Sequence, residues 1–317
     1  PAFGPVISGL MCTLFGWRAV FVVPLVGGIV VAAAGVKLVQ NVGERSNATL
    51  DILSVVLLAA GITAFVYSVG EFSTNLIAGI VTLFAAVVLL GLFAARQLKL
   101  EHPVLNVRPM ASVRFWPACL LVVVSMMTTF SMSVLLPLYF EGAYGMTALV
   151  AGLLILPAIA CNAVTSIVGG RVMDARGAWP LLPVGFALIA VGQTAISMTA
   201  ASMNIGVVVA LTVVVYAGVG LVLSPSQTAG LETLPAAEHP HGTALLNTWN
   251  MIAASFGPSL FIGLLSSSAA TAGAAGVATD VAQAIGFAAA VRVAAVIAVV
   301  WFVASLVYAR RESHMSH

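Results

Sequence analysis

Apolar residues occur along the chain in long runs that are separated by short breaks rich in charged residues, Gly, Pro or Asn. Most runs are about 20 residues long and do not alternate with polar positions, which favours membrane-spanning helices over strands. The pattern predicts an all-α membrane protein with nine complete spans and one partial span. The predicted spans are 1–15, 19–38, 51–69, 75–95, 116–139, 146–168, 180–199, 204–224, 243–266 and 288–309.

The first apolar run, at 1–15, is shorter than the others. As a helix it would reach only about 22 Å at 1.5 Å per residue, whereas a bilayer core is about 30 Å thick. We therefore expect the chain to begin in the middle of a helix, and earlier helices to be missing from it.

Lys and Arg gather in alternate breaks, which all fall on one side of the predicted membrane. Arg18 falls on the other side, and Arg292 lies within the last span. Because cytoplasmic loops are enriched in Lys and Arg, we predict a multi-pass plasma-membrane protein with a cytoplasmic C-terminus. The residues on the basic side are Lys37, Arg45, Arg96, Lys99, Arg108, Arg114, Arg171, Arg176, Arg310 and Arg311.

The composition excludes several function classes. The chain is 61% hydrophobic and 7% charged, against about 25% charged in soluble domains, so most of its surface must face the lipid bilayer. A net charge of +2 is too small to indicate a nucleic-acid partner. The three cysteines show no metal-site spacing, and His239 and His241, with Glu238, could bind a metal weakly but are more often a solvated loop pair. No paired catalytic groups lie at membrane depth, so neither an enzyme nor a cofactor is expected.

A Gly-Pro motif lies in the first apolar run, Gly4-Pro5-Val6-Ile7-Ser8-Gly9. Proline kinks a helix, and small residues let another helix approach closely. A bent, tightly packed helix suits a transporter that must seal one side, although such kinks are also common in ordinary membrane helices. Phe256-Gly257-Pro258 and Gly263 echo the motif far downstream, which favours the internal repeat typical of secondary transporters.

A charged motif fills the break at 169–179. It contains Gly170, Arg171, Asp174, Arg176 and Gly177. Asp174 is placed to pair with either arginine or with a helix N-terminus, and the glycines permit a tight turn. Two interpretations remain: a latch that holds the cytoplasmic helix ends in one state, or a plain charged hairpin loop.

Together the motifs resemble the 14-span drug:proton antiporter branch of the major facilitator superfamily. Residues 4–9 are similar to its antiporter motif in the fifth helix, and residues 16–18 to the connection that follows. Residues 170–177 resemble the second-half copy of its loop motif, although Ala175 and Trp179 stand where basic residues are usual. Residues 137–141 and 156–157 resemble the ends of the next helix pair, with Glu141 where Gln is more usual.

The resemblance implies a major facilitator-type helical bundle that contains about the fifth to fourteenth helices. Residues 1–50 would end the N-terminal half, 51–115 would form an extra two-span linker with a basic cytoplasmic loop, and 116–317 would form a complete six-span C-terminal half. It also implies efflux of amphipathic drugs or toxic small molecules in exchange for protons, by alternating access and without a cofactor. The alternative is a non-transporting fragment, or one subunit of a split transporter that associates with the missing N-terminal helices.

Polar groups within the predicted spans are candidates for a substrate or proton path. No Asp or Glu lies near the middle of a complete span, so Glu141, at a span end, is the candidate carboxylate. Asn247 and Asn250 are three residues apart and share a helix face. Interhelix hydrogen bonding and, for Arg292, snorkelling to the interface are the alternatives. The full candidate set is Tyr139, Glu141, Asn162, Gln193, Asn247, Asn250 and Arg292.

Overall fold

The computed structural model describes residues 4–38, 51–72, 75–100, 103–113, 115–177 and 180–313. The described residues form helices and connecting turns, without strands. The helices are α1 (Gly4–Phe15), η1 (Trp17–Phe21), α2 (Val22–Leu38), α3 (Ile52–Glu71), α4 (Leu76–Lys99), η2 (Arg108–Ala111), α5 (Phe115–Tyr144), α6 (Ala148–Arg176), α7 (Leu181–Thr199), η3 (Ala200–Ser202), α8 (Ile205–Glu232), η4 (Ala236–Glu238), α9 (His239–Ala274) and α10 (Thr279–Ser313).

Within the described ranges, nine helical segments are long and apolar enough to cross a membrane. The first of them runs from Trp17 to Val36 and joins η1 to α2. Helix α1 has 12 described residues and is shorter than a span. The predicted all-α membrane fold is therefore confirmed, and the nine predicted full spans each have a helical counterpart in the described residues.

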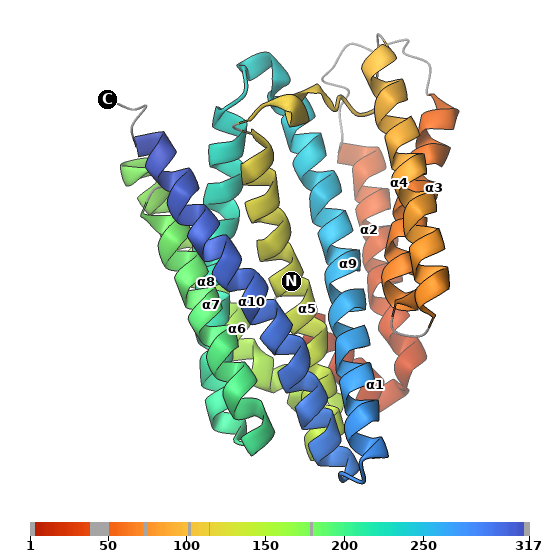
Figure 1. Ribbon diagram of the computed structural model, residues 1–317, viewed down its shortest axis with the longest axis vertical. Coiled ribbons are helices and arrows are strands. Elements are labelled where there is room, and N and C mark those ends of the chain that lie inside the picture. Colours follow the sequence, from red (N-terminus) through yellow and green to blue (C-terminus); the bar gives the residue numbers. More distant parts are fainter. Residues whose placement is uncertain are drawn as a thin grey trace.

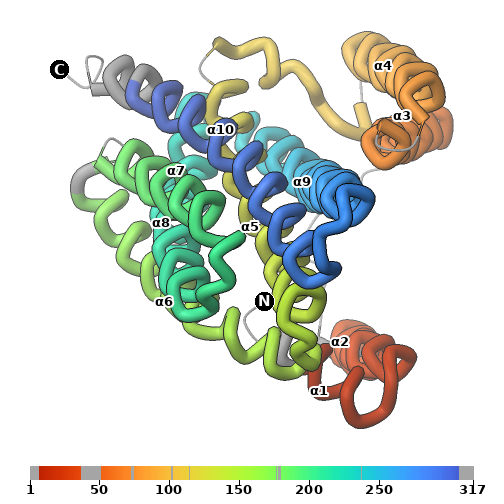
Figure 2. The backbone as a smooth tube through the Cα atoms, turned by 60° about the horizontal axis from the view of Figure 1, so that its bottom comes forward, coloured from red at the N-terminus to blue at the C-terminus, as the bar shows by residue number. Residues whose placement is uncertain are grey.

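Helices α5 to α10 pack together around the main hydrophobic core, in which Tyr139, Phe186 and Phe287 are among the largest buried side chains. Helix α8 lies between α6 and α7 (Figure 2). Glycines allow these close approaches. A Cβ on Gly218 would lie 2.5 Å from the Gly185 carbonyl oxygen, and one on Gly220 would lie 2.1 Å from Thr165 Oγ1.

Two helix pairs flank this six-helix bundle. Helices α3 and α4 form an antiparallel pair at one edge of the molecule (Figure 1), and α3 lies beside α9 (Figure 2). Helix α1 contacts the start of α6, whereas α2 stands apart from α9 and carries no buried residue in the membrane-length segment 17–36 (Figure 2). The bundle and the α3–α4 pair therefore share an interface, whereas α2 exposes apolar side chains all round.

Several predicted span boundaries were wrong because hydropathy marks the bilayer rather than the helix. Helix α6 continues past 168 to Arg176, since α6 contains no proline after Pro157 and the first residue with a helix-ending conformation is Gly177, whose φ is +74°. Helix α9 extends from His239 to Ala274, and α10 begins at Thr279. The extension of α9 beyond 266 is rich in Ala, the strongest helix former.

Candidate functional site

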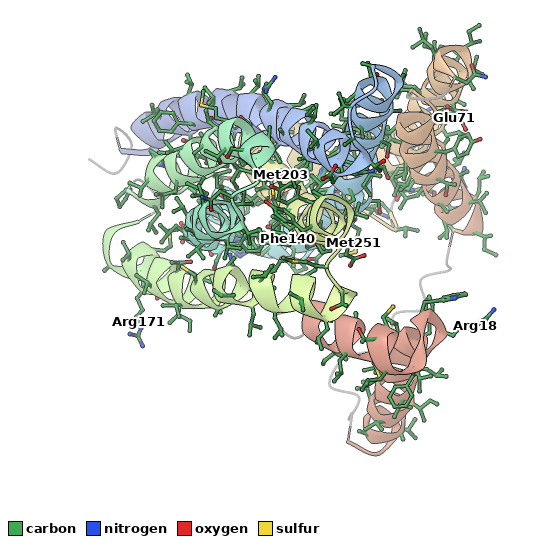
Figure 3. The ribbon with its side chains drawn as sticks, turned by 90° about the horizontal axis from the view of Figure 1, so that it is seen from below. Arg18, Glu71, Phe140, Arg171, Met203 and Met251 are labelled. Carbon is green, nitrogen blue, oxygen red and sulfur yellow. The ribbon has the colours of Figure 1, made fainter. Side chains whose placement is uncertain are left out.

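One face of α9 is exposed but polar. Thr243, Asn247, Met251 and Ser255 follow one another at four-residue spacing and are exposed, so they form a single stripe along the helix. We refer to these four residues as the α9 stripe. Met251 lies on the side of the six-helix bundle that faces α1 and α2 (Figure 3).

The lipid-facing helices look different from α9. Exposed large side chains on α10 include Val293, Val296 and Val300, and α4 likewise exposes aliphatic residues at successive turns. In α9, which the structure describes throughout, Met251 is the one large apolar residue that is exposed. Because polar residues at membrane depth face a bundle interior or a water-filled cavity rather than lipid, the α9 stripe indicates a polar path.

Several buried polar groups of the bundle have no hydrogen-bond partner among the described residues. They are Asn250 Oδ1, Ser131 Oγ, Ser226 Oγ and both side-chain polar atoms of Gln193. An unsatisfied buried polar group costs about 1–3 kcal/mol, so these positions are suited to binding water or a polar ligand. Asn250 is buried whereas Asn247 is exposed, so the two predicted partners meet different surroundings.

Two other candidate residues form hydrogen bonds that join different helices of the bundle. Asn162 Nδ2 donates to the Tyr216 carbonyl oxygen over 3.0 Å, which joins α6 to α8. Tyr139 is fully buried, and its hydroxyl donates to the Ala200 carbonyl oxygen over 2.8 Å. Its ring stacks on Phe287 of α10, with 4.3 Å between centroids. Both residues stabilise the packing of the bundle.

The two charged candidates lie on the outside of the bundle. Glu141 is exposed near the end of α5, and Arg292 is exposed on α10 next to the exposed Val293. The structure therefore distributes the predicted path residues over α5, α6, α7, α9 and α10 and does not bring them into one cluster. Of the seven candidates, Asn247 is the one that lies on the α9 stripe.

The Gly-Pro motif near the start of the chain makes a close contact with α6. Gly9 is buried, and a Cβ there would lie 2.6 Å from the Ala148 carbonyl oxygen and 2.8 Å from Leu149 Cα. Gly4 and Pro5 are the first two residues of α1. Their contacts lie outside the part of the chain that the structure describes. The close packing predicted for the motif is therefore present at Gly9.

The charged motif at 170–177 is helical, which corrects the prediction of a loop. Gly170, Arg171 and Asp174 lie in the last turns of α6, and Arg176 is its final residue. Gly177 ends the helix by donating its N–H to the Met173 carbonyl oxygen over 2.8 Å. Arg171 points away from the bundle (Figure 3), and no ion pair joins it to Asp174 in the described structure.

A polar network at one end of α3 and α4 was not predicted. Arg96 pairs with Asp51, Gln97 Nε2 donates to Ser54 Oγ over 2.6 Å, and the Leu105 N–H donates to Gln97 Oε1 over 3.0 Å. The hydrogen bonds from Arg96 and Ser54 lower the pKa of Asp51 from 3.8 to about 2. The available sequence signal was the placement of opposite charges at the facing ends of two consecutive spans.

Comparison with known proteins now identifies the family. Residues 1–258 match the Major Facilitator Superfamily. The chain belongs to the Major Facilitator Superfamily. This membership confirms the predicted superfamily and also the prediction that the protein is not an enzyme. In the described residues, no group of three or more His, Cys, Asp or Glu side chains is arranged to hold a metal ion.

Similar members of the Major Facilitator Superfamily bear the names of resistance proteins and transporters. The chain is 32% identical to the lincomycin resistance protein LmrB of Listeria monocytogenes, over 84% of this chain and 57% of LmrB. It is 32% identical to the uncharacterized MFS-type transporter YcnB of Bacillus subtilis, over 96% of this chain and 65% of YcnB. It is 24% identical to a multidrug resistance protein B homolog of Mycobacterium tuberculosis, over 84% of this chain and 50% of that protein. The chain thus spans about half to two thirds of the length of these relatives.

Proposed function

We propose that this chain is the C-terminal part of a 14-span transporter that exports amphipathic small molecules in exchange for protons. The α9 stripe is the observation that carries the proposal, because a polar face at membrane depth needs an aqueous or ligand-filled neighbour. The names of the relatives support drug efflux as the direction of transport. The proton gradient would supply the energy, and no cofactor would be needed.

In this proposal residues 116–317 form one complete half of an alternating-access transporter. Residues 1–50 end the other half, and 51–115 insert an extra helix pair between them. The backbone contact of Gly9 with Ala148 would seal the path at one end when the halves close there. Rocking of the halves would then expose the α9 stripe to each side of the membrane in turn.

The proposed orientation places the C-terminus in the cytoplasm. Lys99 ends α4 and Arg108 begins η2, and this end of the bundle also holds the C-terminal end of α10 (Figure 1). Because Lys and Arg concentrate on the cytoplasmic side of membrane proteins, this basic end would be cytoplasmic. Arg171 and Asp174 would then lie at the cytoplasmic end of α6. There they could pair with residues of the other half and so form the latch.

The decisive test is transport by the complete gene product in a bacterium that lacks its own drug exporters. The complete protein should lower the cellular accumulation of an amphipathic cationic dye, and a protonophore should abolish the effect. In inverted vesicles, dye uptake should be accompanied by proton release. Unchanged accumulation in cells that contain the protein in their membrane would contradict the proposal.

The alternative, a non-transporting fragment or one subunit of a split transporter, is favoured by one observation. Residues 17–36 show no buried residue, as expected if other helices normally cover part of this segment. The 317-residue chain expressed alone should therefore give no proton-dependent efflux. If co-expression of a separate chain with the earlier helices restores efflux, and the two chains purify together, the split version is supported.

A further inference from the structure

Three consecutive residues of α9, at 255–257, lie in three different environments. Ser255 is exposed on the α9 stripe. The Phe256 ring stacks on Phe65 of α3, with 5.1 Å between ring centroids and 19° between ring planes. A Cβ on Gly257 would lie 2.7 Å from Ser131 Oγ of α5. Because successive helical residues point about 100° apart, α9 is held between α3 and α5 and is open on its third side.

The same segment of α9 is the part that bends most easily. Pro258 lacks the N–H that would bond to the carbonyl of residue 254, and prolines are the usual origin of helix kinks. Ser255 Oγ donates to the Met251 carbonyl oxygen over 3.1 Å, and Ser259 Oγ donates to the Ser255 carbonyl oxygen over 2.9 Å. Such bonds back to the preceding turn also bend helices. The segment 251–259 therefore combines the features of a hinge.

Helix α3 can support this hinge because α4 holds it near its middle and at its basic end. Near its middle, Gly61 packs closely against Leu90 of α4. At its basic end, Asp51 pairs with Arg96. The chain of bonds from Ser54 through Gln97 to Leu105 then connects the pair to the segment that leads into α5. Helices α3 and α4 thus form one unit that contacts α9 at the hinge and is anchored beside the start of α5.

We propose that Phe65 is a positioning residue for transport: through its stack on Phe256 it sets the bend of α9 at Gly257–Pro258 and thereby the position of the α9 stripe. The predicted effect on transport rests on the proposed transport function. The effect of Phe65 on the bend of α9 does not depend on that function. This positioning gives the extra helix pair a role in the transport cycle. Phe65 contacts α9 through Phe256, which points about 100° away from the exposed Ser255, so the role proposed for Phe65 is to position α9 and not to bind substrate.

The kinetic test compares variants of the complete gene product. Loss of an aromatic pair lowers the stability of one conformation by an amount that corresponds to about a 2- to 10-fold change in an equilibrium. Phe65→Ala should therefore lower the maximal efflux rate about 2- to 10-fold and leave KM nearly unchanged. Phe65→Tyr keeps the ring and should retain the wild-type rate. The matched control is Phe84→Ala on α4, where the side chain is 70% exposed, and its rate should not change.

Equal rates for Phe65→Ala and the wild type would overturn the proposal, as would a change confined to KM. A reversible cross-link supplies a second test, in which one protein is compared with itself before and after oxidation. In a protein whose Cys12, Cys119 and Cys161 are replaced by serine, Phe65→Cys and Phe256→Cys are joined by copper phenanthroline as oxidant. Oxidation should stop efflux and dithiothreitol should restore it, whereas each single-cysteine variant should be insensitive to both reagents. Efflux that continues in the fully cross-linked protein would overturn the proposal.

A labelling experiment separates failure of this proposal from failure of the proposed function. Met251→Cys is added to the cross-linkable protein, because Met251 is 65% exposed on the α9 stripe. The rate of maleimide modification at position 251, followed by peptide mass spectrometry so that the thiols at positions 65 and 256 are not counted, should be lower in the oxidised than in the reduced protein, whether or not any substrate is transported. Equal labelling rates would overturn the positioning role. Absent efflux by the wild type with unequal labelling would instead overturn the proposed transport function alone.

Discussion

Arg96 and Asp51 form a two-pronged ion pair where α4 ends and α3 begins. Arg96 Nε donates to Asp51 Oδ2 over 2.7 Å, and Arg96 Nη2 donates to Asp51 Oδ1 over 3.0 Å. The Asp51 side chain is 16% exposed and that of Arg96 is 39% exposed. This pair closes the antiparallel α3–α4 unit at its basic end.

Asp51→Asn should lower the melting temperature of the purified protein by a few degrees, because the amide cannot replace the charge-assisted bonds to Arg96 and Ser54. Asp280→Asn, at an exposed acid in the first turn of α10, is the control and should melt like the wild type. Thermal unfolding followed by tryptophan fluorescence in detergent provides the measurement. Identical melting of both variants would show that the ion pair does not stabilise the α3–α4 unit.

The pH dependence of this stabilisation follows from the depressed pKa of Asp51. The folded protein lowers that pKa from 3.8 to about 2, so folding favours the ionised carboxylate. The contribution is complete above the unfolded pKa and is lost as the pH falls from about 4 towards about 2. The difference in melting temperature between wild type and Asp51→Asn should therefore be constant from pH 5 to pH 8 (about the range in which neither form titrates) and shrink below about pH 4.

Gly9→Ala should weaken the contact between α1 and α6. The added methyl group would lie 2.6 Å from the Ala148 carbonyl oxygen, and overpacking of this kind costs about 1–3 kcal/mol. Efflux by the complete gene product should fall about tenfold. Gly27→Ala on α2, where nothing lies within 4 Å, should have no effect. Wild-type efflux by Gly9→Ala would argue against a sealing role for this contact.

Replacing the two asparagines of α9 by leucine should affect different properties of the protein. Asn247→Leu changes an exposed position of the α9 stripe and should reduce efflux without altering the melting temperature. Asn250→Leu removes a buried oxygen that has no partner in the described structure, so the melting temperature should stay the same or rise. Efflux rates and melting curves of both variants test this contrast, and a large drop in melting temperature for Asn250→Leu would contradict it.

Gly220→Ala should destabilise the bundle where α8 passes α6. A Cβ at this position would lie 2.1 Å from Thr165 Oγ1 and 2.6 Å from the Asn162 carbonyl oxygen. The backbone contact cannot be relieved by turning a side chain, so α8 must shift, at a cost of about 1–3 kcal/mol. A lower yield of monodisperse protein in size-exclusion chromatography is expected. Gly91→Ala on α4, with nothing within 4 Å, should give the wild-type yield.

Part of the candidate site was predictable, because its signals are local in the sequence. Gly9 can lie close to α6 because it has no side chain. A Gly-Pro motif in an apolar run therefore indicates such a contact directly. Asn247 was named because polar residues within spans are rare and therefore conspicuous. Whether a polar residue is exposed, like Asn247, or bonded to another helix, like Asn162, depends on the neighbouring helix. The local sequence around the residue does not determine it.

The sequence by itself determined that this protein is a multi-pass helical membrane protein, how many full spans it has and which superfamily it belongs to. Hydropathy and short motifs suffice for this, because insertion into a bilayer depends on the local composition of each segment. The tertiary structure decided that the motif at 170–177 continues α6, that Arg96 faces Asp51, and that Phe65 of α3 stacks on Phe256 of α9. Those relationships join residues that are distant in the chain, and they depend on the rotation and depth of each helix against its neighbours, which hydropathy does not specify.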